Sequence, residues 1–168
     1  MKVQFFVAAV SLLIGVASWA QQAPVCMANG QPLPVNNDQI LAWKTSTANQ
    51  FKSRGHIQGT ISSVFANATG HNHFQAQIGP NASDVIEVIY NEDFGSVTTT
   101  FQIGDQVEAC GDYITATQQA GPYPPSPDGA ILHWVHQSPS PRHDSGFMMV
   151  NGTLYGQDAE DAGPKRRW

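Results

Sequence analysis

The stretch from His56 to Val64 reads His-Ile-Gln-Gly-Thr-Ile-Ser-Ser-Val, and its two isoleucines decide how the chain is interpreted. Ile57 and Ile61 are an even number of residues apart, so they share one face if the segment is extended. Polar and small residues occupy most positions between them. The stretch therefore predicts a half-buried β-strand.

Turn residues separate this strand from further β-type segments on its C-terminal side. Gly79-Pro80-Asn81 and Gly104-Asp105 carry turn chemistry, and the four prolines within 121–129 exclude a regular element there. Asn151-Gly152 is typical of a tight hairpin turn. The predicted strands are 55–65, 74–78, 85–90, the segment from Gly104 through Cys110 to Ile114, 130–136, and a terminal hairpin of 147–150 and 153–155.

On the N-terminal side, Asn36 or Asn37 is suited to cap one helix whose apolar residues begin at Ile40 and Leu41. One helix and five to seven short strands fit a mainly β fold. We expect a small OB-like β-barrel with one N-terminal amphipathic helix, and a β-sandwich is the main alternative. No repeat or second domain is visible.

The first twenty residues have the pattern of a cleaved signal peptide. Lys2 precedes the apolar run Val3 to Val16, and small residues lead to a cleavage site after Ala20. An uncleaved membrane anchor is the alternative, but the run is short for a span. The predicted organisation is a signal peptide at 1–20, an extended arm at 21–35, the barrel at 36–156 and a disordered polar tail at 157–168, with no membrane span after cleavage.

Charge and cysteine content narrow the compartment and the partners. The residues after Ala20 include seven Lys and Arg against thirteen Asp and Glu, a formal charge of −6 that disfavours general binding to nucleic acid. Cys26 and Cys110 are the two cysteines, and export predicts that they form a disulfide, with free thiols or metal ligation as alternatives. We expect an exported protein, periplasmic or secreted.

Polar chemistry is concentrated between Ile131 and His143, where Arg142 and three of the six histidines lie; His71 and His73 form a second group. The motifs Gly70-His71-Asn72-His73-Phe74, Gly104-Asp105-Gln106-Val107, Gly111-Asp112-Tyr113 and His133-Trp134-Val135-His136, with Pro139, Arg142-His143 and Gly146-Phe147, resemble a family of small exported bacterial proteins of unknown function. The resemblance covers about Asn36 to Tyr155 and favours the barrel over the sandwich.

This sequence also departs from that family. Tyr90-Asn91 stands where His-Asn is usual, His73 stands where Arg is more usual, and the loop 121–129 is longer. A role that needs a histidine at position 90 is therefore in doubt, and the resemblance implies a bacterial envelope without implying an activity.

Two kinds of chemistry are open to these residues. Imidazoles are common ligands of a transition metal such as zinc, and Asp144 could add an oxygen. The predicted metal ligands are His71, His73, His136 and His143. However, His133 and His136 point to opposite faces of an unbroken strand, which weakens the metal motif.

The second kind of chemistry is anion binding. Arg142 offers a planar fork for phosphate or carboxylate, and Trp134 or Tyr113 could supply a stacking surface. The predicted ligand-binding residues are His71, His73, Trp134, His136, Arg142 and His143, with His133 on the same face or rim. Asp105 and Asp112, which adjoin glycines, are expected to be turn residues.

The leading prediction is an exported binding module for a small anionic or glycan-like ligand. A metal-dependent hydrolase, such as a phosphodiesterase or nuclease, and a structural or partner-binding envelope protein are the alternatives. The partner would be a small ligand or an envelope component, and whether the protein is an enzyme is left open.

Overall fold

The computed structural model describes residues 21–66, 70–97 and 99–157. The predicted signal peptide and nearly all of the predicted tail lie outside these residues. The described chain forms β1 (Met27–Ala28), β2 (Gln31–Pro32), α1 (Asn37–Ser46), β3 (Lys52–Val64), β4 (His71–Gln77), β5 (Val85–Asn91), the short 3-10 helix η1 (Glu92–Phe94), β6 (Gln106–Thr115), β7 (Ala130–His133), β8 (Phe147–Val150) and β9 (Thr153–Tyr155).

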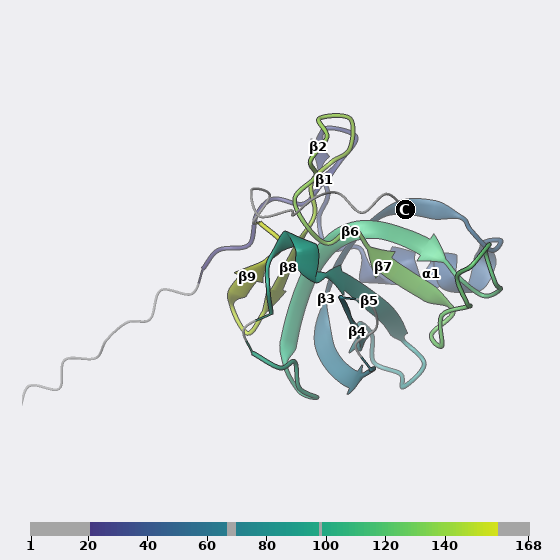
Figure 1. The fold of residues 1–168 in the computed structure, drawn as a ribbon. Helices are drawn as coiled ribbons and strands as arrows, with labels where there is room; N and C mark the ends of the chain where they lie inside the picture. The colour runs from purple at the N-terminus through teal and green to yellow at the C-terminus, as the bar shows by residue number, and fades with distance from the viewer. Residues whose placement is uncertain (1–20, 67–69, 98, 158–168) are drawn as a thin grey trace, which may run out of the picture.

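Five strands close into a barrel in the order β3-β4-β5-β7-β6, and β6 pairs back onto β3. β5 and β7 run parallel, whereas the other neighbouring pairs in the barrel are antiparallel. The β8–β9 hairpin extends the sheet from β6 (Figure 1). The mainly β prediction is thus confirmed as a closed five-stranded barrel.

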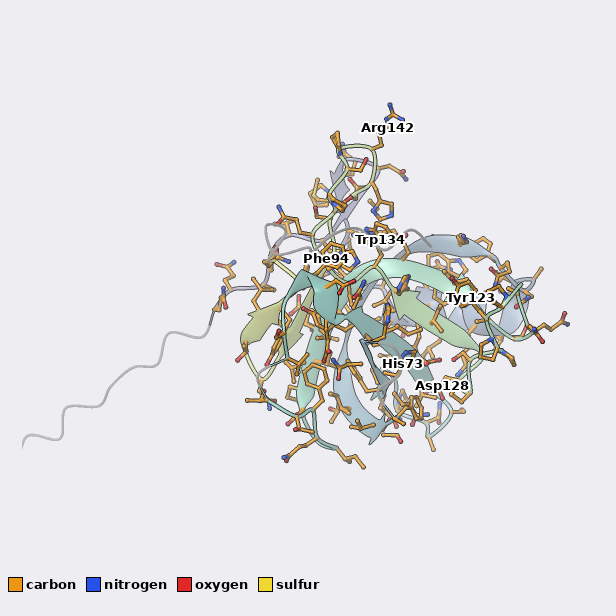
Figure 2. All side chains as sticks on the ribbon, in the orientation of Figure 1. His73, Phe94, Tyr123, Asp128, Trp134 and Arg142 are labelled. Atoms are coloured by element: carbon orange, nitrogen blue, oxygen red, sulfur yellow. A yellow bond between two sulfur atoms is a disulfide. The ribbon has the colours of Figure 1, made fainter. Side chains whose placement is uncertain are left out.

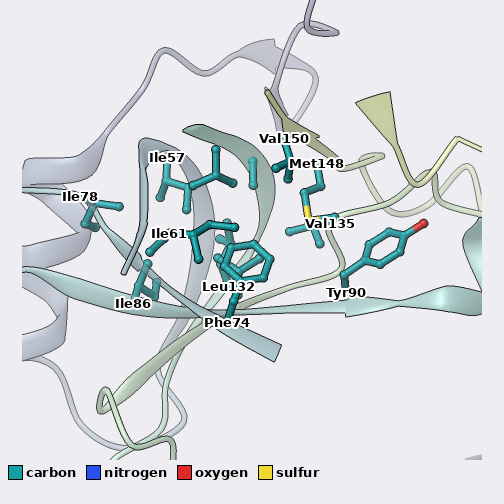
Figure 3. Packing of buried hydrophobic residues seen from close by; sticks show 14 of the residues in the cluster. Ile57, Ile61, Phe74, Ile78, Ile86, Tyr90, Leu132, Val135, Met148 and Val150 are labelled. Atoms are coloured by element: carbon teal, nitrogen blue, oxygen red, sulfur yellow. The ribbon is translucent and has the colours of Figure 1, made fainter. Parts of the chain in front are cut away.

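The barrel interior is filled by side chains that alternate along each strand. Ile57 and Ile61 of β3 are fully buried, as their spacing predicts, and they pack with Phe74, Ile86 and Leu132 (Figure 3). Alternation leaves the intervening residues of each strand on the outer side of the barrel. These outer positions carry most of the polar residues discussed below.

β7, the last barrel strand in chain order, is shorter than predicted. A strand over 130–136 was expected, but β7 ends at His133 because Trp134 adopts a left-handed backbone conformation, with φ of 59°. The terminal hairpin of β8 and β9 has its predicted bounds. By contrast, β4 begins at His71, three residues before the predicted start, which places both of its histidines in the sheet.

The N-terminal arm is fastened to the barrel by a disulfide between Cys26 and Cys110, which confirms the predicted pairing. β1 and β2 form a small hairpin that projects from the barrel beside the 137–145 loop (Figure 1). The Asn29 N–H donates to Asp144 Oδ2 at 2.7 Å and joins the two projections.

In the described part of the chain, no helix has the length and apolarity needed to cross a membrane. A disulfide is compatible with an exported protein.

Candidate functional site

Three imidazole rings from two strands lie on the outer side of the barrel. On β4, Phe74 is buried in the core, so His71 and His73, at the alternate positions, point outward. On β7, Leu132 is buried in the core, and the next residue, His133, points outward. We call His71, His73 and His133 the histidine face.

The rings of the histidine face are close together, although β5 lies between the two strands. The ring centroid of His71 is 6.4 Å from that of His73 and 6.4 Å from that of His133. The register of β5 with β4 and β7 places Ile89 between His73 and His133. The barrel therefore joins residues about sixty positions apart in the sequence.

Carboxyl groups border the histidine face along β5 and the loop before β7. His73 Nδ1 lies 2.8 Å from Glu87 Oε1, and Glu87 is only 6% exposed. Next to them, Gln75 Nε2 donates to Asp128 Oδ1 at 2.6 Å. Asp128 is also buried, and burial raises the pKa of its carboxyl group. His73 and Asp128 lie in the same region of the barrel in Figure 2.

An ion-pair network adjoins the face where β6 runs between β7 and β3. The register pairs Asp112 with His133 and with Arg54. Asp112 Oδ1 accepts from Arg54 Nη1 at 2.8 Å, and its Oδ2 lies 2.8 Å from His143 Nε2. Arg54 also donates to the Met27 and Ser145 carbonyls, so it ties the arm and the 137–145 loop to the barrel.

Trp134 stands at the centre of the segment that leaves β7. Its ring centroid lies 4.9 Å from that of His143 and 5.0 Å from that of His136. Its positive φ is costly for a bulky residue, by about 1 to 3 kcal/mol. The backbone here is also crowded: a Cβ at Gly146 would clash with the Trp134 carbonyl oxygen, which explains the glycine at that position.

His136 is a packed residue in this arrangement. It is 2% exposed, its ring stacks on Phe94 of η1 with centroids 3.5 Å apart, and its Nδ1 donates to the Gln137 carbonyl at 2.9 Å. Burial lowers the pKa of His136 to about 4. Burial, with a smaller contribution from His71, likewise lowers the pKa of His133 to about 4. Both rings are neutral at pH 7.

The lowered pKa of His136 predicts that acid destabilises the protein. Between pH 6.5 and about 4 the unfolded chain holds a proton on this ring that the folded chain excludes, so stability falls as the pH falls. We expect His136 alone to contribute about 3 kcal/mol of this loss. Urea denaturation from pH 7 to pH 4 measures it.

The His136→Phe variant serves as the control, because it keeps a ring against Phe94 but cannot titrate. Its stability should depend less steeply on pH over the same range. An equally steep dependence in the variant would contradict the assignment.

The other predicted site residues are dispersed. Arg142 is exposed at the tip of the projecting loop and points away from the barrel (Figure 2). Asp144 accepts from the arm at Asn29. Tyr113 is 0% exposed in the core, so the prediction that it could offer a stacking surface is wrong. Asp112 was expected in a turn but lies within β6, because its neighbour Gly111 is itself a strand residue.

The four histidines predicted as metal ligands do not assemble into one ligand set. His71 and His73 belong to the histidine face, whereas His136 is stacked on Phe94 and His143 contacts Asp112. Across residues 21–66, 70–97 and 99–157, no three His, Cys, Asp or Glu side chains are placed to hold a metal ion.

Sequence reasoning missed Arg54, Glu87 and Phe94. Arg54 and Glu87 lie on predicted strands, but their partners Asp112 and His73 become visible only once the strand register is known. The one sequence signal for Arg54 and Glu87 is that each is a charged residue in a strand with few other charges. Phe94 carries no such signal, because its ring contact depends on the irregular turn at Trp134.

Fold and site together define the class of protein: a small disulfide-linked β-barrel with an imidazole-rich outer face. The chain matches, over residues 23–156, the family described as Protein of unknown function (DUF3465), and it belongs to that family. No curated protein matches the chain.

Proposed function

We propose that the protein is an exported binding module that holds a small anionic ligand on the histidine face. The observation that carries the proposal is the convergence of three outward imidazoles, with both neighbouring centroid distances at 6.4 Å. Imidazole N–H groups donate hydrogen bonds, and protonated rings add a positive charge. A phosphate or carboxylate group satisfies both.

The architecture supports a ligand at this position. The closed barrel resembles an OB-fold, in which the second and third strands and the loops beside them bind oligonucleotides or sugars. β4 and β5 are the second and third strands of this barrel in chain order, and β4 carries His71 and His73. We expect a small ligand because the chain after Ala20 has a formal charge of −6, which disfavours a long polyanion.

Ligand charge and protonation are coupled at His133. Burial holds this ring neutral at pH 7. An anion bound against it raises the pKa of this ring from its low value, so binding strengthens as the pH falls below 7. The anion thus offsets the repulsion that His71 would otherwise exert on a protonated His133.

Export forms part of this proposal. The apolar segment at 1–20 and the disulfide support a periplasmic or secreted location. Such a location gives the domain access to envelope components and to small ligands outside the cytoplasm.

We expect inorganic phosphate or glucose 6-phosphate to bind more tightly at pH 6 than at pH 7.5, as measured by isothermal titration calorimetry. His71→Ala and His133→Ala should each weaken binding by at least about tenfold, the effect of losing one charge-assisted hydrogen bond. Glucose, which lacks the anionic group, should bind weakly or not at all.

Arg142→Ala is the matched control, because it removes a cation from the projecting loop and leaves the face intact. It should bind as the unsubstituted protein does. If the histidine variants lose stability but bind the anions unchanged, the histidines are structural and the proposal fails.

A further inference from the structure

Two histidines of the histidine face differ in their surroundings. A carboxylate orients the ring of His73, whereas burial keeps the ring of His133 neutral. Glu87 is 6% exposed and lies 2.8 Å from His73 Nδ1. An ionised carboxylate can only accept a hydrogen bond, so His73 donates through Nδ1. A buried carboxylate in this position fixes the orientation and tautomer of a histidine, as in the catalytic triad of serine proteases.

Among the described residues, His56 and Glu108 form a further His–carboxylate pair, which lies away from the histidine face. His56 Nε2 lies 3.0 Å from Glu108 Oε1, and the ring packs edge-on against Phe147. Its Nδ1 is 2.9 Å from the Leu33 carbonyl oxygen, so both ring nitrogens are engaged. This pair therefore fastens the arm to the barrel, and it provides a comparison for the pair on the histidine face.

Across β5 from His73, His133 has the opposite electrostatic setting. Burial lowers the pKa of His133 to about 4, so the ring is neutral and can accept a proton at pH 7. Two strand spacings separate the two residues, about 9 to 10 Å between their Cα atoms. His71 lies next to both His73 and His133. A group the size of a phosphate could lie between the rings of His73 and His133.

We propose that the histidine face cleaves small phosphodiesters that carry a hydroxyl group next to the esterified carbon. This inference rests on the proposed function, because the anion it binds becomes the reacting phosphate. Acid–base catalysis by two histidines is its mechanism.

The step is balanced within the substrate and the two rings. His133 takes the proton of the neighbouring hydroxyl, and that oxygen forms a bond to phosphorus. The bond from phosphorus to the leaving oxygen breaks, and the leaving oxygen takes the Nε2 proton of His73, which acts in this step as an imidazolium beside the Glu87 carboxylate. His71 donates a hydrogen bond to a non-bridging oxygen. The products are a cyclic phosphodiester and an alcohol, and proton exchange with water restores both histidines.

Two observations favour this substrate class. Attack by a hydroxyl within the substrate gains from proximity and needs no separately activated water. Long RNA is disfavoured by the formal charge of −6, because such binding needs many cationic side chains to neutralise successive phosphates. Short ribonucleotide diesters combine the required hydroxyl with a single phosphate.

The test incubates the purified protein with the dinucleotide uridylyl-3′,5′-adenosine in the presence of EDTA and separates the products by chromatography. We expect adenosine and uridine 2′,3′-cyclic phosphate in equal amounts. The analogue with deoxyuridine should remain intact because it lacks the attacking hydroxyl. His73→Ala and His133→Ala, purified identically, should each lower the rate by about 100-fold or more.

Two further variants separate catalysis from folding. His56→Gln alters the comparison pair away from the face and should cleave at the unsubstituted rate. Glu87→Gln should lower kcat by about tenfold or more while uridine 3′-phosphate still binds with its original affinity, as expected of a positioning residue.

Absence of cyclic product, or equal cleavage by the His133→Ala protein, would overturn the inference. If uridine 3′-phosphate still binds in that case, the binding function stands without the activity. If it does not bind either, both proposals fail.

Discussion

A protein in which Cys26 and Cys110 are both replaced by serine should unfold with a free energy about 4 kcal/mol below that of the unsubstituted protein. The disulfide joins residues 84 positions apart, and releasing a loop of that size restores conformational entropy to the unfolded chain. A domain has only about 5 to 15 kcal/mol of stability in total, so this loss is a large part of it. Urea denaturation measures the difference.

The unsubstituted protein, unfolded in the presence of a reductant, is the independent control. Its transition should approach that of the double serine variant, because both lack the cross-link. If the free energies of unfolding of the oxidised and the cross-link-free protein differ by less than about 1 kcal/mol, the disulfide to the arm contributes little to the stability of the barrel.

Arg54→Ala should lower the free energy of unfolding by about 3 kcal/mol. Arg54 is largely buried, and its removal leaves the partly exposed Asp112 carboxylate poorly compensated, which costs more than the pair itself contributes. Arg54 has a side-chain exposure of 10%, and it donates to Asp112, Met27 and Ser145. Its loss therefore also frees the arm and the 137–145 loop. Thermal and urea unfolding report the change.

Two other substitutions make this prediction specific. Arg142→Ala removes an exposed arginine and should change stability by no more than about 0.5 kcal/mol. Arg54→Lys keeps the charge but not the planar fork, so its loss should be intermediate. Equal stability of the Arg54→Ala and Arg142→Ala proteins would contradict the role of the network.

Much of the barrel could be predicted because strand periodicity and turn residues act locally. The isoleucines of β3 and the Asn-Gly turn between β8 and β9 predicted elements that the structure contains. The disulfide could be predicted from compartment and cysteine count. The end of β7 could not, because nothing in the sequence indicates that Trp134 adopts a left-handed backbone conformation.

The candidate site was harder to predict because it depends on register. The concentration of polar residues between Ile131 and His143 pointed to Arg142 as a site residue, yet its side chain projects from a loop tip. Arg54 is instead the arginine that contacts Asp112. His136 attracts interest as a ligand in the sequence, but a neighbouring aromatic ring from η1 stacks against it. Sequence patterns identify which residue types are rich in chemistry; strand pairing decides which of them meet.

An NMR titration of the histidine ring resonances with inorganic phosphate at pH 6 tests directly whether the histidine face binds an anion. We predict saturable chemical-shift changes for the rings of His71, His73 and His133. The resonances of His56, whose ring contacts Glu108 and the Leu33 carbonyl, should not change. Shifts confined to His56, or no saturable shift on the histidine face, would contradict an anion site there.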